Sequence, residues 1–112
     1  MDYKVKAVLD AASACLWDLD VVVEFESLRF FWVSDKLASE VDLEPSDLVG
    51  RFVGEVVLLD SNHVKGVFLR LVKGDSSFPL SFVSRGGKVV NLLFKSDCFD
   101  FQGISYFVGK LL

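Results

Sequence analysis

The sequence predicts an α+β domain in which a group of helices covers one face of an antiparallel β-sheet. One stretch of alternating apolar and polar residues, 16–25, and one largely aromatic stretch, 28–33, come early in the chain. Helical patterns fill residues 34–73, and three more alternating stretches joined by short turns end the chain. Strands and helices that are grouped in this way are typical of α+β architectures, so we expect the first two strands to join the last three in one sheet.

The first 14 residues are expected to form an amphipathic helix. The apolar positions that recur at the spacing of one helical face are Val5, Val8, Leu9 and Ala12. This apolar face has two possible partners. It could cover the outer face of its own sheet, or it could pair with the same helix of a second copy. In the second case these four residues are the candidate homodimer contacts.

Residues 16–25 are predicted to form the first strand, because apolar side chains alternate with acidic ones. Asp18 and Asp20 share one expected face of that strand. The alternation turns both carboxylates toward solvent, where they are surface charges rather than a catalytic pair. Glu26–Ser27 makes a tight turn, and residues 28–33 form the second strand.

Two short helices are expected next. Ser34 is a suitable N-cap for a helix that runs to about Val41. Pro45 suits the first turn of a second helix, since its φ is already helical and it has no N–H to leave unpaired. Asp47 then places a negative charge at the positive end of that helix, and Gly50 can end it in a left-handed turn.

A longer amphipathic helix is predicted for residues 60–73, with Gly74 as its stop. Residues 52–59 before it are apolar and suggest one further helical turn. The apolar stripe of the long helix consists of Val64, Val67, Phe68 and Leu71.

The last third of the chain is predicted to be three strands, at residues 78–83, 88–99 and 104–112. Turns at residues 85–87 and 100–103 connect them as hairpins. In the middle strand the apolar face carries Val90, Leu92, Phe94 and Cys98.

This order of elements, with the run Leu43–Arg51 at its centre, resembles the PAS sensor-domain family. In that family a Pro-acidic-acidic-Leu-aliphatic-Gly-Arg run closes one side of a small-molecule pocket. Phe31–Ser34 is similar to the family's second strand and following helix, and Val72–Asp75 to the end of its long helix. The turns Ser84–Gly87 and Asp100–Gly103 match its two hairpins.

The resemblance covers the whole chain and implies a single PAS domain at residues 1–112, with an N-terminal helix at 1–14 and a core at 15–112. It implies a non-catalytic sensory and dimerisation module of a larger signalling protein. Output domains of such proteins are commonly histidine kinases, diguanylate cyclases or transcription regulators. We expect the output domain to lie outside this chain, because the sequence ends at Leu112 before the family's usual connector.

A small apolar ligand could bind between the last strands and the long helix, since ligand pockets prefer apolar walls with few polar groups. The alternative is a core that aromatic side chains fill completely. The candidate pocket residues are His63, Val67, Phe68, Leu71, Leu80, Phe82, Leu92 and Phe94.

The sequence leaves the cofactor unknown. His63 is the only histidine, and its place on the long helix resembles that of the axial ligand in PAS proteins that bind haem. The alternative is a solvated side chain near the start of that helix, and a single histidine is a weak sign of haem. A covalent flavin adduct is excluded at the family's usual position, because Gly50–Glu55 contains no cysteine.

Composition excludes several classes of function. The net charge of −4 and the pI near 4.8, with scattered basic residues, argue against a nucleic-acid partner. The longest apolar runs have about four residues, far short of a membrane span, and the N-terminus does not resemble a signal peptide. We therefore expect a cytoplasmic domain without direct membrane contact, although its parent protein could be attached to a membrane. Free thiols are expected at Cys15 and Cys98, and no metal site is expected. The high apolar content, 52%, favours a pocket, an oligomer interface or both.

Two alternatives to a sensor remain. A cone-shaped α+β enzyme of the ketosteroid-isomerase type is also small and apolar inside, but its chemistry needs a carboxylate facing an acid donor, and Tyr3 and Tyr106 are the only phenols. A purely structural pairing domain without a ligand is the second alternative.

Overall fold

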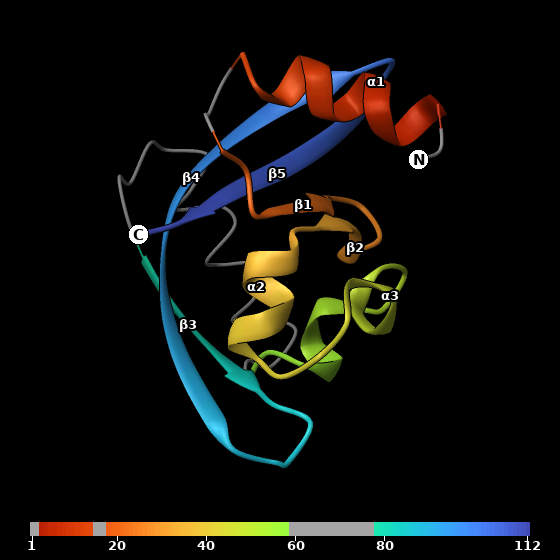
Figure 1. Cartoon of the computed structure of the whole chain (residues 1–112). Helices are drawn as coiled ribbons and strands as arrows, with labels where there is room; N and C mark the ends of the chain where they lie inside the picture. The colour runs from red at the N-terminus through yellow and green to blue at the C-terminus, as the bar shows by residue number, and fades with distance from the viewer. Residues whose placement is uncertain (1–2, 15–17, 59–77) are drawn as a thin grey trace.

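Five antiparallel strands form one sheet, and helices lie against both of its faces (Figure 1). The computed structural model describes residues 3–14, 18–58 and 78–112. The helices are α1 (Tyr3–Ala12), α2 (Asp35–Glu40), α3 (Pro45–Leu48) and the 3-10 turn η1 (Val53–Glu55). The strands are β1 (Val21–Glu24), β2 (Arg29–Val33), β3 (Phe78–Val83), β4 (Val89–Phe101) and β5 (Ile104–Leu111).

The strand order is β2-β1-β5-β4-β3, so the first strand of the chain lies beside the last one. Strand β1 pairs with β5, with Val22 opposite Val108, and this pairing joins the early hairpin to the late strands. The expected α+β architecture with a single five-stranded antiparallel sheet is confirmed.

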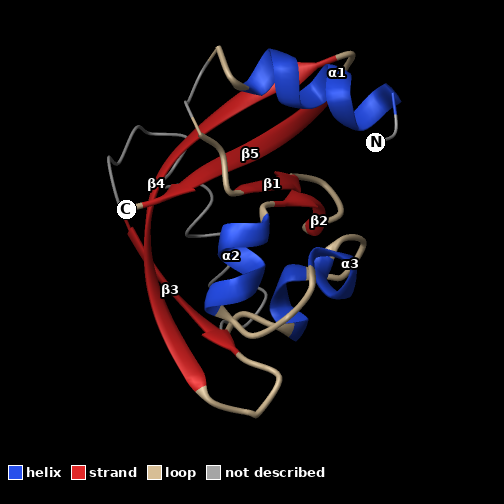
Figure 2. Ribbon diagram, viewed as in Figure 1, coloured by secondary structure: helices blue, strands red, loops and turns tan. Residues whose placement is uncertain are grey.

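Strand β1 is buried on both faces, and this explains its run of three valines. Val21 and Val23 point into the larger core, on the side of α2 and α3, whereas Val22 belongs to a smaller core beneath α1. Figure 2 shows the resulting layers: α1 lies across one face of the sheet, and α2 and α3 lie on the other.

Helix α1 uses its apolar face to cover its own sheet. Val8 and Ala12 are fully buried, together with Val22, Tyr106 and Val108 of the sheet. Of the two partners expected for this apolar face, the helix's own sheet therefore covers Val8 and Ala12. No helix in the described parts of the chain is long and apolar enough to cross a membrane.

The prediction for the first strand is wrong at its start and on one face. Strand β1 begins at Val21 rather than at residue 16, and Asp18 has a φ of +52°, which interrupts an extended chain. Asp18 is exposed as predicted, but Asp20 is only 5% exposed. Its carboxylate points into the protein instead of toward solvent.

The hairpin between β4 and β5 is tighter than predicted. Strand β4 continues to Phe101, and the connection is the two-residue turn Gln102–Gly103. Both turn residues have positive φ, +51° and +79°, the backbone that two-residue hairpins require.

The local signals in the centre of the chain are confirmed. Ser34 caps α2, Pro45 opens α3, and Gly50 has a φ of +88° just after that helix. Within residues 52–59, the expected helical turn is the 3-10 turn η1. The predicted long helix at 60–73 lies outside the described residues.

Candidate functional site

The inner face of strands β3 and β4 carries four of the predicted pocket residues. Leu80 lies opposite Leu92 in the register of the two strands. Phe82 and Phe94 are almost completely buried, and their ring centroids are 6.0 Å apart. The sheet therefore supplies one apolar wall, as expected.

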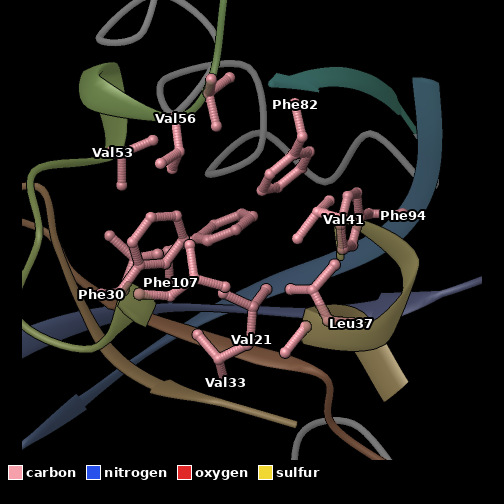
Figure 3. Close-up of a cluster of buried hydrophobic side chains, with 14 of the residues drawn as sticks. Val21, Phe30, Val33, Leu37, Val41, Val53, Val56, Phe82, Phe94 and Phe107 are labelled. Carbon is pink, nitrogen blue, oxygen red and sulfur yellow. The ribbon is translucent and has the colours of Figure 1, made fainter. Parts of the chain in front are cut away.

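Short helical elements supply the facing wall. Leu37 and Val41 come from the segment of α2, and Val53 and Val56 from the segment of η1; all four side chains are buried (Figure 3). In Figure 3 they point toward the rings that the sheet contributes, so aliphatic side chains face aromatic ones across the interior. An isolated backbone bridge between Val57 and Phe82 fixes this wall to β3.

The other four predicted pocket residues, His63, Val67, Phe68 and Leu71, lie outside the described residues. The helical wall that they were expected to form, and the role of His63 as a haem ligand, stay predictions.

Two further side chains on the inner face of β4 carry polar or reactive atoms. The Ser96 hydroxyl is buried and has no hydrogen-bond partner in the described structure. Cys98 is a free, half-buried thiol whose pKa is raised above its ordinary value, first by burial and then by the charges of Asp97 and Asp100. The raised pKa favours the protonated thiol over the nucleophilic thiolate.

A buried polar network lies where β1, α2 and β5 meet. The Ser34 hydroxyl donates a hydrogen bond of 2.7 Å to Asp20 Oδ1, and the Leu37 amide donates to Ser34 Oγ at 3.1 Å. The backbone amide of Leu111 donates to Asp20 Oδ2 at 2.8 Å. One carboxylate thus connects the start of α2 to the end of the last strand. Sequence reasoning missed it, because it treated Asp20 as a surface charge.

An ion pair connects α3 to the turn between β3 and β4. Arg85 Nη2 lies 2.7 Å from Asp47 Oδ2, and the same carboxylate oxygen accepts a hydrogen bond from the Glu44 amide at 2.9 Å. These contacts lower the pKa of Asp47, chiefly through the Glu44 amide and then through the charge of Arg85. Sequence reasoning gave Asp47 only a favourable interaction with the helix dipole.

Two hollows open on the surface of the described structure. The larger, about 470 Å³, lies beside that ion pair and is lined by Asp35, Ser39, Asp42, Leu43, Glu44, Pro45 and Arg85. The smaller, about 250 Å³, lies near the β4–β5 hairpin and is lined by Phe25, Cys98, Phe99, Asp100, Ser105 and Tyr106. Neither contains any of the predicted pocket residues.

The predicted dimer contacts divide into two pairs. Val8 and Ala12 are fully buried within the chain, and therefore offer no surface to a second copy while α1 stays on its sheet. Val5 and Leu9 remain partly exposed. A homodimer stays a prediction, and these two residues are what the helix leaves available for it.

No protein-family model matches this chain, and no curated protein matches it either. Solved structures do. The PAS domain of an HTR-like protein from Haloarcula marismortui is 17% identical, with a TM-score of 0.69 over 97% of this chain and 93% of the other. A PAS domain from a two-component sensor histidine kinase is 10% identical, with a TM-score of 0.70 over 96% of both chains.

A third structure is the PAS domain, in complex with ethanol, of a LuxR-family transcriptional regulator from Burkholderia thailandensis. It is 16% identical, with a TM-score of 0.55 over 100% of this chain and 98% of the other. At such low identities these similarities establish the fold.

Proposed function

Because this chain has the PAS fold, we propose that it is a non-catalytic sensory module of a larger signal-transduction protein and that it binds a small, largely apolar molecule between its helices and its sheet. Solved relatives of this fold belong to a sensor kinase and to a transcriptional regulator, and the regulator's domain was solved with ethanol. The observation that carries the proposal is the inner face of β3 and β4, where the buried rings of Phe82 and Phe94 face aliphatic side chains.

The proposed mechanism is a shift between two arrangements of the helical wall. A ligand changes such an equilibrium only when it binds one arrangement more tightly. Helix α2 contributes Leu37 to the interior, and its N-cap Ser34 bonds to Asp20, which in turn bonds to the end of β5. A displacement of α2 on ligand binding would therefore reach the last strand through this carboxylate.

Toluene is a suitable first probe of the interior, because it is apolar and small. We expect a titration followed by ¹H–¹⁵N NMR to shift the amides of Leu92 and Phe94. Leu92→Trp, on the inner face, should fill the site and abolish binding. Leu93→Trp is the matched control, since Leu93 is 45% exposed on the opposite face of the same strand.

Binding that both tryptophan variants retain would place toluene elsewhere and contradict the proposed site. Mass spectrometry of a denatured sample tests for a molecule that the protein already carries. If toluene does not bind and no molecule is released, the role that remains is that of a structural pairing domain.

We also propose that two copies pair through the part of α1 that the sheet leaves exposed. Size-exclusion chromatography with light scattering should show a dimer that Val5→Lys weakens. Lys6→Gln, an exposed position on the same helix, serves as the control. A monomer at high protein concentration would contradict this proposal. That result would leave the proposed sensory role intact.

A cone-shaped enzyme is a poorer account of the chain. Tyr106 lies in the core beneath α1, on the face opposite the interior, and Tyr3 is 88% exposed. Neither phenol is placed to serve as an acid in the apolar interior. The module is proposed to work in the cytoplasm. The haem prediction for His63 is tested separately, by an absorption spectrum of the purified protein.

A further inference from the structure

The hydroxyl of Ser96 differs from the other strand hydroxyls of this protein. Ser81 donates a hydrogen bond to Asn91, and Ser105 donates one to Asp100. The oxygen of Ser96 is equally capable of such bonds and is buried, yet in the described structure it has no partner. Buried polar groups are almost always satisfied, so an exception needs a reason.

The described neighbours of Ser96 in the sheet are apolar or lack a side chain. Its side chain shares the inner face of β4 with Phe94 and Cys98, two residues away on either side. Across the strand pair it lies opposite Gly109, which has no side chain, with Phe107 and Leu111 as the diagonal neighbours. A single hydroxyl is therefore set in apolar surroundings on the face that borders the interior.

The neighbouring residues on this face cannot offer a ligand a comparable hydrogen bond. Leu92 and Phe94 have no hydrogen-bonding side chain, and the thiol of Cys98 is a weak donor. Serine Oγ can both donate and accept, and it can rotate to suit its partner. A molecule in the interior that brings one polar atom to this point would satisfy an oxygen that has no partner in the described structure.

We propose that Ser96 is the hydrogen-bonding anchor of the interior site and selects small, mostly apolar molecules that carry one hydroxyl or carbonyl oxygen. This inference rests on the proposed ligand-binding function. An apolar interior alone would accept any hydrocarbon of suitable size. The buried hydroxyl adds a preference, because leaving it unpaired is unfavourable and a ligand oxygen removes that penalty.

Benzyl alcohol and toluene form a matched pair of probes, since they share a ring and differ by one hydroxyl group. Their dissociation constants would be measured by ¹H–¹⁵N NMR titration of the wild-type chain, of Ser96→Ala and of Ser81→Ala. We expect Ser96→Ala to weaken benzyl alcohol about tenfold and to leave toluene unchanged, because one neutral hydrogen bond is lost. Ser81→Ala, on the next strand, should change neither constant.

The outcomes separate this inference from the proposed function. If Ser96→Ala affects both probes equally, or neither of them, Ser96 is not the anchor and the interior site stands. If neither probe binds the wild-type chain, the ligand-binding function and the anchor both fail.

Thermal unfolding without any ligand gives a second test. A hydroxyl that has no partner contributes nothing favourable, so Ser96→Ala should leave the Tm unchanged or raise it. Ser34→Ala, which removes a bonded hydroxyl, should lower the Tm. A clear loss of stability in Ser96→Ala would show that the fold already satisfies this oxygen, and would overturn the inference.

Discussion

The carboxylate of Asp20 accepts a hydrogen bond from the backbone amide of Leu111, although 91 residues separate the two in sequence. The contact measures 2.8 Å and is buried. It joins the residue before the first strand to the last residue of the final strand. The other oxygen of the same carboxylate binds the N-cap of α2, so three elements meet at one side chain.

Replacing Asp20 with alanine should lower the free energy of unfolding by about 2–4 kcal/mol, because it leaves the Leu111 amide and the Ser34 hydroxyl without their buried acceptor. Urea denaturation of Asp20→Ala measures this loss. Asp18→Asn is the control, since Asp18 is exposed and asparagine tolerates its φ of +52°, and it should change stability by less than about 0.5 kcal/mol. Equal stabilities for the two variants would mean that Asp20 faces solvent after all.

Ser34→Ala should cost about 1 kcal/mol as the loss of an N-cap, and the cost should depend on Asp20. In an Asp20→Ala background the serine hydroxyl has already lost its acceptor, so the second substitution should cost less. A double-mutant cycle by denaturation tests this coupling. Ser39→Ala, at an exposed position in the same helix, is the control, and strict additivity of the Ser34 and Asp20 effects would contradict the network.

The elements that the sequence predicts correctly are those with local signals. Strand β3 has the predicted bounds, 78–83, because alternating residues lead directly into a Gly-Gly turn. The caps of the two central helices likewise depend on residues within one turn of each cap, such as Ser34 and Pro45.

Asp20 could not be placed in the same way. Alternation assigns it to the solvent only if the strand begins well before it, and the left-handed backbone of Asp18 breaks that assumption. Its partners come from positions 34 and 111, and no local pattern indicates contacts over such separations. Ser96 is a different case. Ser96 alternates in step with Phe94 and Cys98, which places it on the inner face from sequence alone. Its position opposite Gly109 and its lack of a hydrogen-bond partner in the described structure are visible only in the folded sheet.

The contacts of the Asp47 carboxylate with Glu44 and Arg85 should make the free energy of unfolding depend on pH in the acidic range. The folded pKa of Asp47 lies below its ordinary value of 3.8, chiefly because its carboxylate accepts a hydrogen bond from Glu44. A depressed carboxyl pKa contributes stability that is fully present above the unfolded pKa. That contribution is lost as the pH falls through the folded pKa. Unfolding midpoints measured between about pH 2 and 5 should therefore fall less steeply in Asp47→Asn than in the wild type.

The same carboxyl offers a test of which contact matters more. Carbon-detected NMR titration of Asp47 gives its pKa directly. Arg85→Gln should raise that pKa only part of the way toward 3.8, because the bond from the Glu44 amide remains and is the larger cause. A return to the full ordinary value would assign the shift to Arg85 alone.

Gly109 allows close packing between β5 and β1, and alanine there should destabilise the fold by about 1–3 kcal/mol through overpacking. A Cβ at this position would lie 2.9 Å from Val21 Cγ1 and 3.4 Å from Phe94 Cδ1, both in the core. Gly86→Ala is the control, because no atom lies within 4 Å of its added carbon. Denaturation of both variants measures the difference.

If the clash with Val21 is the cause, Gly109→Ala should be nearly neutral in a Val21→Ala background, where the obstructing methyl is absent. A penalty that persists there would mean that the glycine is required for another reason.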